Sequence, residues 1–239
     1  MVCWMAAPAA AQPLRRATIW DLKIGAPIAA QPDPNEFRGF ACGSNGGPPR
    51  APLAGWADFK RCPAEPDGLR EVYFEYDDEF EYIARAHDNV REISRWAGTH
   101  EVTFPVITSA LFDDAGILKG VRMVTDARPE HRNDITEANR KKREEAYTLG
   151  TVMASRFNID PARDCRSAPP AEGESPVGAL FVKQVCERRD AAAGRRIVVR
   201  ASLFRKPGQS GYNPQLPTQL TQGQFESSAR VEVYQFDAP

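Results

Sequence analysis

The stretch that decides the predicted fold is residues 69–128, LREVYFEYDDEFEYIARAHDNVREISRWAGTHEVTFPVITSALFDDAGILKGVRMVTDAR. Residues 71–76 alternate apolar and polar side chains and are rich in aromatic and β-branched types, which favours a strand. From Phe80 the apolar residues recur with helical spacing. Gly98 ends this predicted helix, because glycine readily takes the left-handed conformation found at helix ends.

Two further apolar runs, 103–112 and 117–125, follow the helix. They are joined by Asp113-Asp114-Ala115-Gly116, a turn whose glycine can take a positive φ. The stretch therefore predicts a β-α-β-β unit in which one helix packs on an antiparallel hairpin.

The C-terminal half shows a similar order of elements. Asp134 and Glu137 form a capping pair for a second helix, whose apolar stripe reaches Phe157. Strands are expected at 178–188, 196–205 and 229–236, with a long polar loop at 206–228. The predicted class is α+β, with an antiparallel sheet of about six strands, two helices packed on one face, and two β-α-β-β-like halves, 69–128 and 129–239. In element order alone, residues 69–236 resemble small exported bacterial modules such as outer-membrane assembly lipoproteins and the β-lactamase inhibitor protein.

Composition limits the class of partner. The chain has 239 residues, of which 42% are hydrophobic, and a formal net charge of -1. A dedicated nucleic-acid binder would carry a clustered basic excess, so no nucleic-acid partner is predicted. No apolar run approaches the ~20 residues of a membrane span, and no transmembrane segment is predicted.

The N-terminal region is expected to lie outside the regular fold. Residues 1–11 resemble the end of a secretory signal with a cleavage site at Ala9-x-Ala11, and the alternative is an Ala-rich disordered tail. Residues 12–68 contain many glycines and prolines and little periodicity, which predicts an irregular arm. The glycine cluster at 43–47 lacks the Lys-Ser/Thr ending of a nucleotide loop, so a structural turn is favoured over a phosphate cradle.

Four cysteines follow the signal-like segment. An even number in an exported chain predicts two disulfides, with three possible pairings. We favour Cys42–Cys62 and Cys165–Cys186, because each closes a short loop in sequence rich in glycine and proline. The alternative is four reduced, buried cysteines in a cytosolic protein. The expected localisation is periplasmic or secreted.

Candidate catalytic residues are few. The densest acidic group comprises Asp77, Asp78, Glu79 and Glu81, which could supply general acid and base or bind a metal. The simpler interpretation is that Asp78 and Glu81 cap the helix that follows them. The spacing of the three histidines matches no metal motif, and neither a metal nor a cofactor is predicted.

The favoured hypothesis is an exported, non-enzymatic protein of the bacterial cell envelope that binds an envelope or secreted protein. Its expected contact surfaces are the exposed sheet face and the 206–228 loop, with the candidate contact residues Tyr212, Gln215, Gln219 and Phe225. The alternative is a hydrolase with carboxylate or metal chemistry at 77–81. The residues assigned to that alternative are Asp77, Asp78, Glu79, His100 and Asp126.

Overall fold

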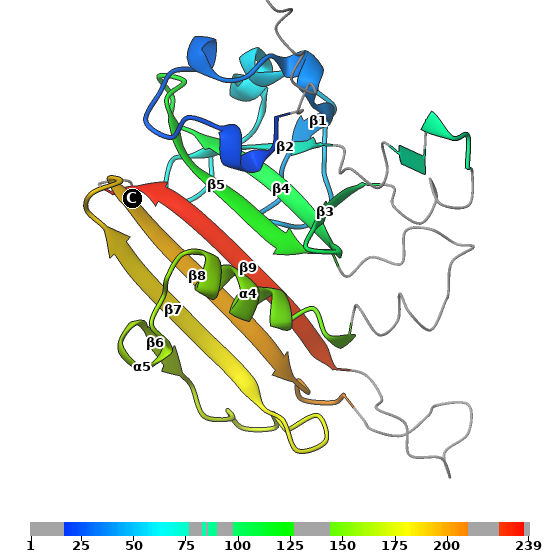
Figure 1. The fold of residues 1–239 in the computed structure, drawn as a ribbon, viewed down its shortest axis with the longest axis vertical. Helices are drawn as coiled ribbons and strands as arrows, with labels where there is room; N and C mark the ends of the chain where they lie inside the picture. Colours follow the sequence, from blue (N-terminus) through cyan, green and yellow to red (C-terminus); the bar gives the residue numbers. More distant parts are fainter. Residues whose placement is uncertain are drawn as a thin grey trace, which may run out of the picture.

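The structure, a computed structural model, describes residues 17–76, 83–84, 86–89, 98–126, 144–209 and 225–236. Its strands are β1 (Arg38–Cys42), β2 (Arg70–Glu75), β3 (Thr99–Glu101), β4 (Phe104–Phe112), β5 (Leu118–Thr125), β6 (Cys165–Ser167), β7 (Val182–Asp190), β8 (Arg195–Phe204) and β9 (Glu226–Gln235). Its helices are η1 (Ile19–Asp21), η2 (Ile28–Ala30), η3 (Pro34–Glu36), η4 (Trp56–Arg61), α4 (Thr148–Arg156) and α5 (Pro161–Asp164). The strands form one antiparallel sheet in the order β1-β2-β4-β5-β9-β8-β7-β6, and β3 pairs with the start of β4 (Figure 1).

The predicted α+β class is wrong, because the protein is mostly antiparallel sheet. The sheet has nine strands rather than about six, and helix accounts for only 18% of the structure. In the part of the chain that the structure describes, one helix of seven residues or more, α4, packs on the sheet in place of the predicted pair. The first of them, at 80–97, lies mostly outside the described residues. Of the second, predicted from Asp134 to Phe157, the described part contains α4, which starts at Thr148.

A side chain from the sheet explains where α4 begins. The Ser227 hydroxyl donates to the Glu144 carbonyl oxygen (2.8 Å) and accepts from the Tyr147 N–H (3.3 Å). These hydrogen bonds take up backbone groups that a continuous helix would use itself. Ser227 belongs to β9, about 80 residues further along the chain, so no local sequence pattern reveals its effect. Residues 145–147 form turns and α4 follows them. Tertiary contacts thus override the helical spacing of the apolar residues.

Six predicted strands are confirmed, as β2, β4, β5, β7, β8 and β9, with ends shifted by up to about four residues. The three strands that the pattern missed are short. β3 and β6 have three residues each and β1 has five, too few to show alternation. The strands of the predicted halves, 69–128 and 129–239, belong to one continuous sheet, because β9 pairs with β5 on one side and with β8 on the other.

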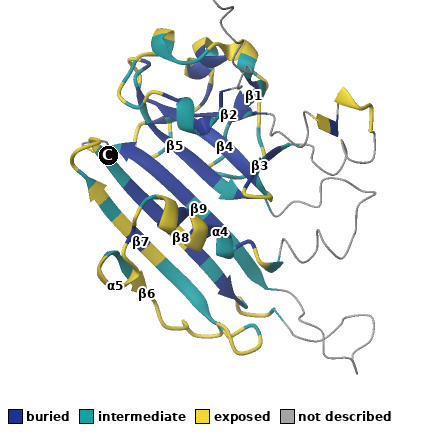
Figure 2. Cartoon of the chain, viewed as in Figure 1, coloured by how far each residue is buried: buried dark blue, intermediate teal, exposed yellow. Residues whose placement is uncertain are grey.

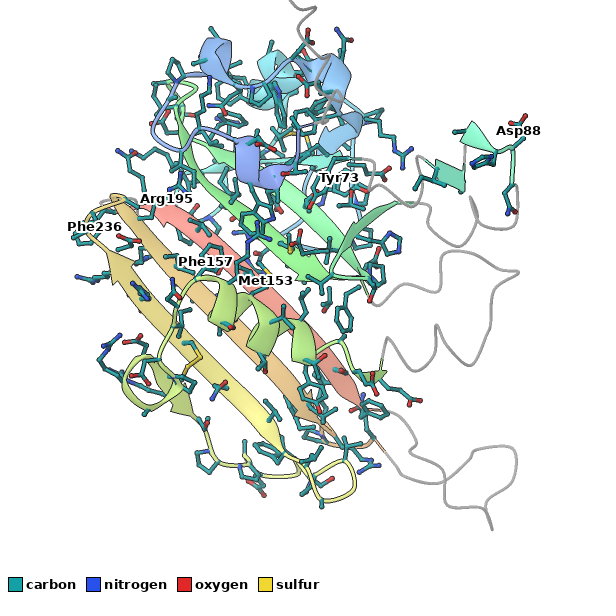
Figure 3. The ribbon with its side chains drawn as sticks, viewed as in Figure 1. Tyr73, Asp88, Met153, Phe157, Arg195 and Phe236 are labelled. Atoms are coloured by element: carbon teal, nitrogen blue, oxygen red, sulfur yellow. A yellow bond between two sulfur atoms is a disulfide. The ribbon has the colours of Figure 1, made fainter. Side chains whose placement is uncertain are left out.

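The main core lies on one face of the sheet, which α4 and the N-terminal arm cover. Leu149 and Met153 of α4 are fully buried in it, and α4 lies across β8 and β9 (Figures 1 and 3). Gly150 permits this close approach, since a Cβ there would lie 2.9 Å from the Ala201 Cβ. Buried residues concentrate in the central strands, and β7 is more exposed (Figure 2). Within the described ranges, no helix has the length and apolar content needed to cross a bilayer.

The N-terminal arm is more ordered than predicted. It adds β1 to the sheet and places Trp56 of η4 at the centre of an aromatic group with Phe40 and Phe74, at ring distances of 4.6 and 5.1 Å. The Cys42–Cys62 disulfide ties the end of β1 to the residue that follows η4. The arm therefore forms part of the core as well as crossing its surface.

Candidate functional site

The face of the sheet that points away from α4 carries most of the charged strand residues, and we call it the open face. Side chains alternate between faces along a strand, and the core residues Cys186, Val199 and Val231 lie on the α4 side. Their strand neighbours therefore lie on the open face, which looks away from the viewer in Figure 1. Strand register arranges them in three rows: Arg166, Val185, Arg200 and Arg230; Glu187, Val198, Glu232 and Arg122; and Arg189, Arg196 and Tyr234.

A buried ionic group, the Arg122 cluster, lies at the middle of this face and consists of Arg122, Glu65, Glu71 and Glu232. Arg122 forms a bidentate pair with Glu65, with Nη1–Oε1 and Nη2–Oε2 distances of 2.8 and 3.0 Å. Its Nη1 lies 3.1 Å from Glu71 Oε2, and its Nε lies 3.0 Å from Glu232 Oε1. The Arg122 side chain is only 3% exposed. One guanidinium therefore joins β5, β2, β9 and the segment before β2.

Three members of the cluster, Arg122, Glu65 and Glu232, have pKa values shifted so that the charged form is favoured at neutral pH. Burial alone would raise the pKa of Glu232, but hydrogen bonds and charges from Arg230, Arg200 and Arg122 outweigh it and lower that pKa to about 2. Burial likewise opposes the lowering of the Glu65 pKa, which the Arg122 guanidinium brings about. Burial would lower the pKa of Arg122, but its glutamate partners raise it. Such groups are poor proton donors or acceptors near pH 7.

The glycine loop at 43–47 holds one of these carboxylates. The Glu71 side chain accepts hydrogen bonds from the N–H groups of Asn45 and Gly46, the latter at 3.3 Å. A Cβ at Gly43 would lie 2.3 Å from Glu71 Cδ, so the loop needs glycine there. The predicted structural role of this turn is confirmed, and the anion that its N–H groups bind belongs to the protein itself.

Beside the Arg122 cluster lies the exposed part of the open face, which we call the arginine patch and define as Arg166, Val185, Arg189, Arg196 and Arg200. The Arg189 and Arg200 side chains are 67% and 46% exposed. Val185 is 43% exposed and pairs with Arg166 on one side and Arg200 on the other. Arg189 and Arg196 are directly opposite each other. The patch thus places one apolar side chain among four cations.

Aromatic rings support two of these arginines. The Arg189 guanidinium lies 5.7 Å from the centre of the Phe236 ring, and the Arg196 guanidinium lies 5.2 Å from that of Tyr234. Phe236 follows β9 at the end of the sheet where β7 turns into β8 (Figure 3). The Tyr234 hydroxyl donates to Glu232 Oε1 (3.0 Å). Cation–π contacts of this kind hold a guanidinium near the surface while leaving its edge able to donate hydrogen bonds.

The predicted disulfides are both confirmed. Cys42 pairs with Cys62, and Cys165 pairs with Cys186, where it links β6 to β7 (Figure 3). Two disulfides fit a protein of an oxidising compartment.

The structure tests the residues of the hydrolase alternative only in part. The acids at 77–79 lie outside the described residues. His100 pairs with Pro105 across β3 and β4, and the Asp126 N–H donates to the Pro105 carbonyl oxygen (2.8 Å). The fold thus brings His100 and Asp126 to the same end of β4. Among the described residues, no group of three or more His, Cys, Asp or Glu side chains is arranged to hold a metal ion.

The predicted interaction loop is likewise tested only in part. Tyr212, Gln215 and Gln219 lie outside the described residues. Phe225 is half-buried and directly precedes β9. Its role in binding stays a prediction.

Sequence reasoning missed the Arg122 cluster and the arginine patch. The partners Glu65 and Glu232 lie 57 and 110 residues from Arg122 in the chain, too far apart for any motif to connect them. The available signal was Arg122 itself, a charged residue within a predicted strand. Comparisons with protein-family models, with curated proteins and with solved structures find no match for this chain.

Proposed function

We propose that this protein is an exported, non-enzymatic binding protein of the bacterial cell envelope, and that the arginine patch is its contact surface. The observation that carries the proposal is the exposed Val185, which lies within a paired strand between Arg166 and Arg200. Contact surfaces are enriched in arginine, and their energetic centres combine apolar burial with desolvated arginines. A partner that covered Val185 would bring both flanking guanidiniums into the interface.

The state of the buried charges supports binding over catalysis. The carboxylates of Glu65, Glu71 and Glu232 all accept hydrogen bonds from arginine or from backbone N–H groups. Glu232 has a pKa of about 2, far from the value that suits a general acid or base at neutral pH. These groups therefore hold the sheet and the glycine loop together beneath the patch.

The compartment is part of the proposal. The two disulfides favour an oxidising environment, and the signal-like residues 1–11 favour export. We accordingly place the protein in the periplasm or outside the cell, where its partner is an envelope or secreted protein. The hydrolase alternative stays a prediction. The positions of His100 and Asp126 at the same end of β4 do not decide for it or against it.

Site-specific crosslinking in the producing cells tests the proposal. A photoreactive amino acid replaces Val185 in one strain and, as a matched control, Val152 in another; Val152 is 39% exposed on α4, on the other side of the sheet. We expect a discrete adduct of higher mass with the probe at position 185 and none at position 152. Equal labelling at both positions, or no adduct at position 185, contradicts the proposed surface.

A further inference from the structure

The spacing of the arginine patch indicates the shape of its ligand. Arg196 and Arg200 lie four residues apart on β8, about 13 Å at ~3.3 Å per residue. Arg166 and Arg200 lie two strands apart, about 10 Å at ~4.8 Å per strand. These are spacings between backbone positions, and they spread the four arginines over an area larger than one carboxylate or phosphate group. The patch therefore fits an extended ligand that carries several anionic groups.

The electrostatics of the patch favour an anionic ligand. Arg189 and Arg196 are directly opposite on one face, where like charges repel each other. The Glu187 carboxylate lies 3.8 Å from Arg189 Nε and is itself half-exposed, so it screens that charge weakly. Arg200 donates through one Nη atom to Glu232 while 46% of its side chain stays exposed. A ligand carboxylate placed over these guanidiniums would relieve their mutual repulsion.

The chemistry of the patch distinguishes an acidic protein segment from a nucleic acid. Guanidinium groups bind carboxylates with two parallel hydrogen bonds, and Val185 offers an apolar contact for a neighbouring side chain. Single-stranded nucleic acids bind largely by stacking their bases on exposed aromatic rings. Tyr234 is only 7% exposed and Arg196 lies over its ring, and the Arg189 guanidinium lies against the more exposed ring of Phe236.

We infer that the arginine patch binds an extended, acidic segment of a partner protein, with acidic side chains over the arginines and an apolar side chain against Val185. This inference rests on the proposed function and names the chemistry of the partner. The ligand runs across β6, β7 and β8, the strands that carry the patch.

Fluorescence anisotropy with defined probes tests the inference. The first probe is a labelled ten-residue peptide that alternates glutamate with valine or serine, the second has glutamine in place of every glutamate, and the third is labelled decathymidine. We expect saturable binding of the glutamate peptide alone, weakening as salt is added. Equal binding of the glutamine peptide would overturn the inference. Tighter binding of decathymidine would show that the partner is a nucleic acid instead.

Charge-reversal variants locate the binding. R166E/R189E alters two patch arginines for which no bond to the Arg122 cluster is seen. It should weaken binding of the glutamate peptide by at least about tenfold. The matched control is K23E/R61E, which makes the same change of net charge at exposed positions in the N-terminal arm. The affinity of this control variant for the glutamate peptide should stay within about twofold of that of the unmodified protein, since long-range electrostatic effects are screened by salt. Equal losses in the two variants would mean that only net charge matters, which contradicts the inference.

A second variant and a combined experiment keep the two proposals separable. R196Q/R200Q removes the other two patch charges, and thermal melting checks that it folds; a folded variant with unchanged peptide affinity contradicts the inference. The position-185 crosslink is then repeated in the R166E/R189E background. Loss of the adduct supports an acidic partner. A crosslink that persists leaves the proposed contact surface standing and refutes the acidic partner.

Discussion

The Arg122 cluster gives the sharpest prediction for stability. Replacing Arg122 by methionine keeps an unbranched side chain of similar length but leaves two buried glutamates, Glu71 and Glu232, and the partly buried Glu65 without their shared cation. Removing one partner of a buried ion pair costs about 3–5 kcal/mol. The Glu232 pKa leads to a similar free energy. Lowering it from 4.5 to about 2 is equivalent to about 3 kcal/mol, and Arg230 and Arg200 share in that effect with Arg122. We therefore expect Arg122→Met to lose about 3–5 kcal/mol of unfolding free energy at pH 7.

The loss should depend on pH with a definite sign. In the unmodified protein the lowered pKa values of Glu65 and Glu232 give stability that is present above pH 4.5 and is lost as the pH falls towards about 2. Without Arg122 these carboxyl groups take up protons at higher pH in the folded variant. The variant therefore loses less stability on acidification, and its deficit relative to the unmodified protein should narrow between pH 7 and pH 4.

The assay is equilibrium urea unfolding followed by tryptophan fluorescence at pH 7 and pH 4, with both disulfides intact. Arg61→Met is the control, since the Arg61 side chain is 60% exposed and its pair with Asp58 should be worth at most about 1 kcal/mol. Glu65→Gln in the Arg122→Met background should recover part of the loss by removing an uncompensated charge. A deficit below 1 kcal/mol at pH 7, or one that is the same at both pH values, would refute this account of the cluster.

Three further substitutions test how backbone and packing fit together. Gly43→Ala drives a methyl group into the Glu71 side chain, held by Arg122, and should lower the urea midpoint by the equivalent of about 1–3 kcal/mol; an unchanged midpoint would mean that the loop can shift freely. Gly150→Ala should gain up to about 1 kcal/mol of helix propensity in α4 yet lower the melting temperature, because its Cβ would lie 2.9 Å from a β8 methyl group; a rise would show that α4 is loosely seated. Val102 and Thr103 both have positive φ, so V102N/T103G should raise the melting temperature by at least about 2 °C, and a fall would argue that the β3–β4 turn contributes side-chain contacts.

Features set by neighbouring residues were predictable from the sequence, and features set by distant residues were not. The strands at 103–112 and 117–125 were predictable because alternation along a strand and the turn at Asp113–Gly116 are local properties. The pairing of Cys42 with Cys62 followed from the short loop that it closes. The helix expected from Asp134 to Phe157 is interrupted by turns at 145–147, where Ser227, far along the chain, bonds the backbone of Glu144 and Tyr147; residues 134–143 lie outside the described residues.

The sequence by itself determined the six longer strand segments, and it favoured the two observed disulfides and the structural use of the glycine loop, because each depends on neighbouring residues or on the closure of a short loop. Only the tertiary structure decided the order of the strands, which inserts β9 between β5 and β8. That order brings Glu232 to Arg122 and sets Arg166, Val185 and Arg200 in one row. The candidate contact surface arises from strand register, and register depends on pairing between residues that are distant in the chain.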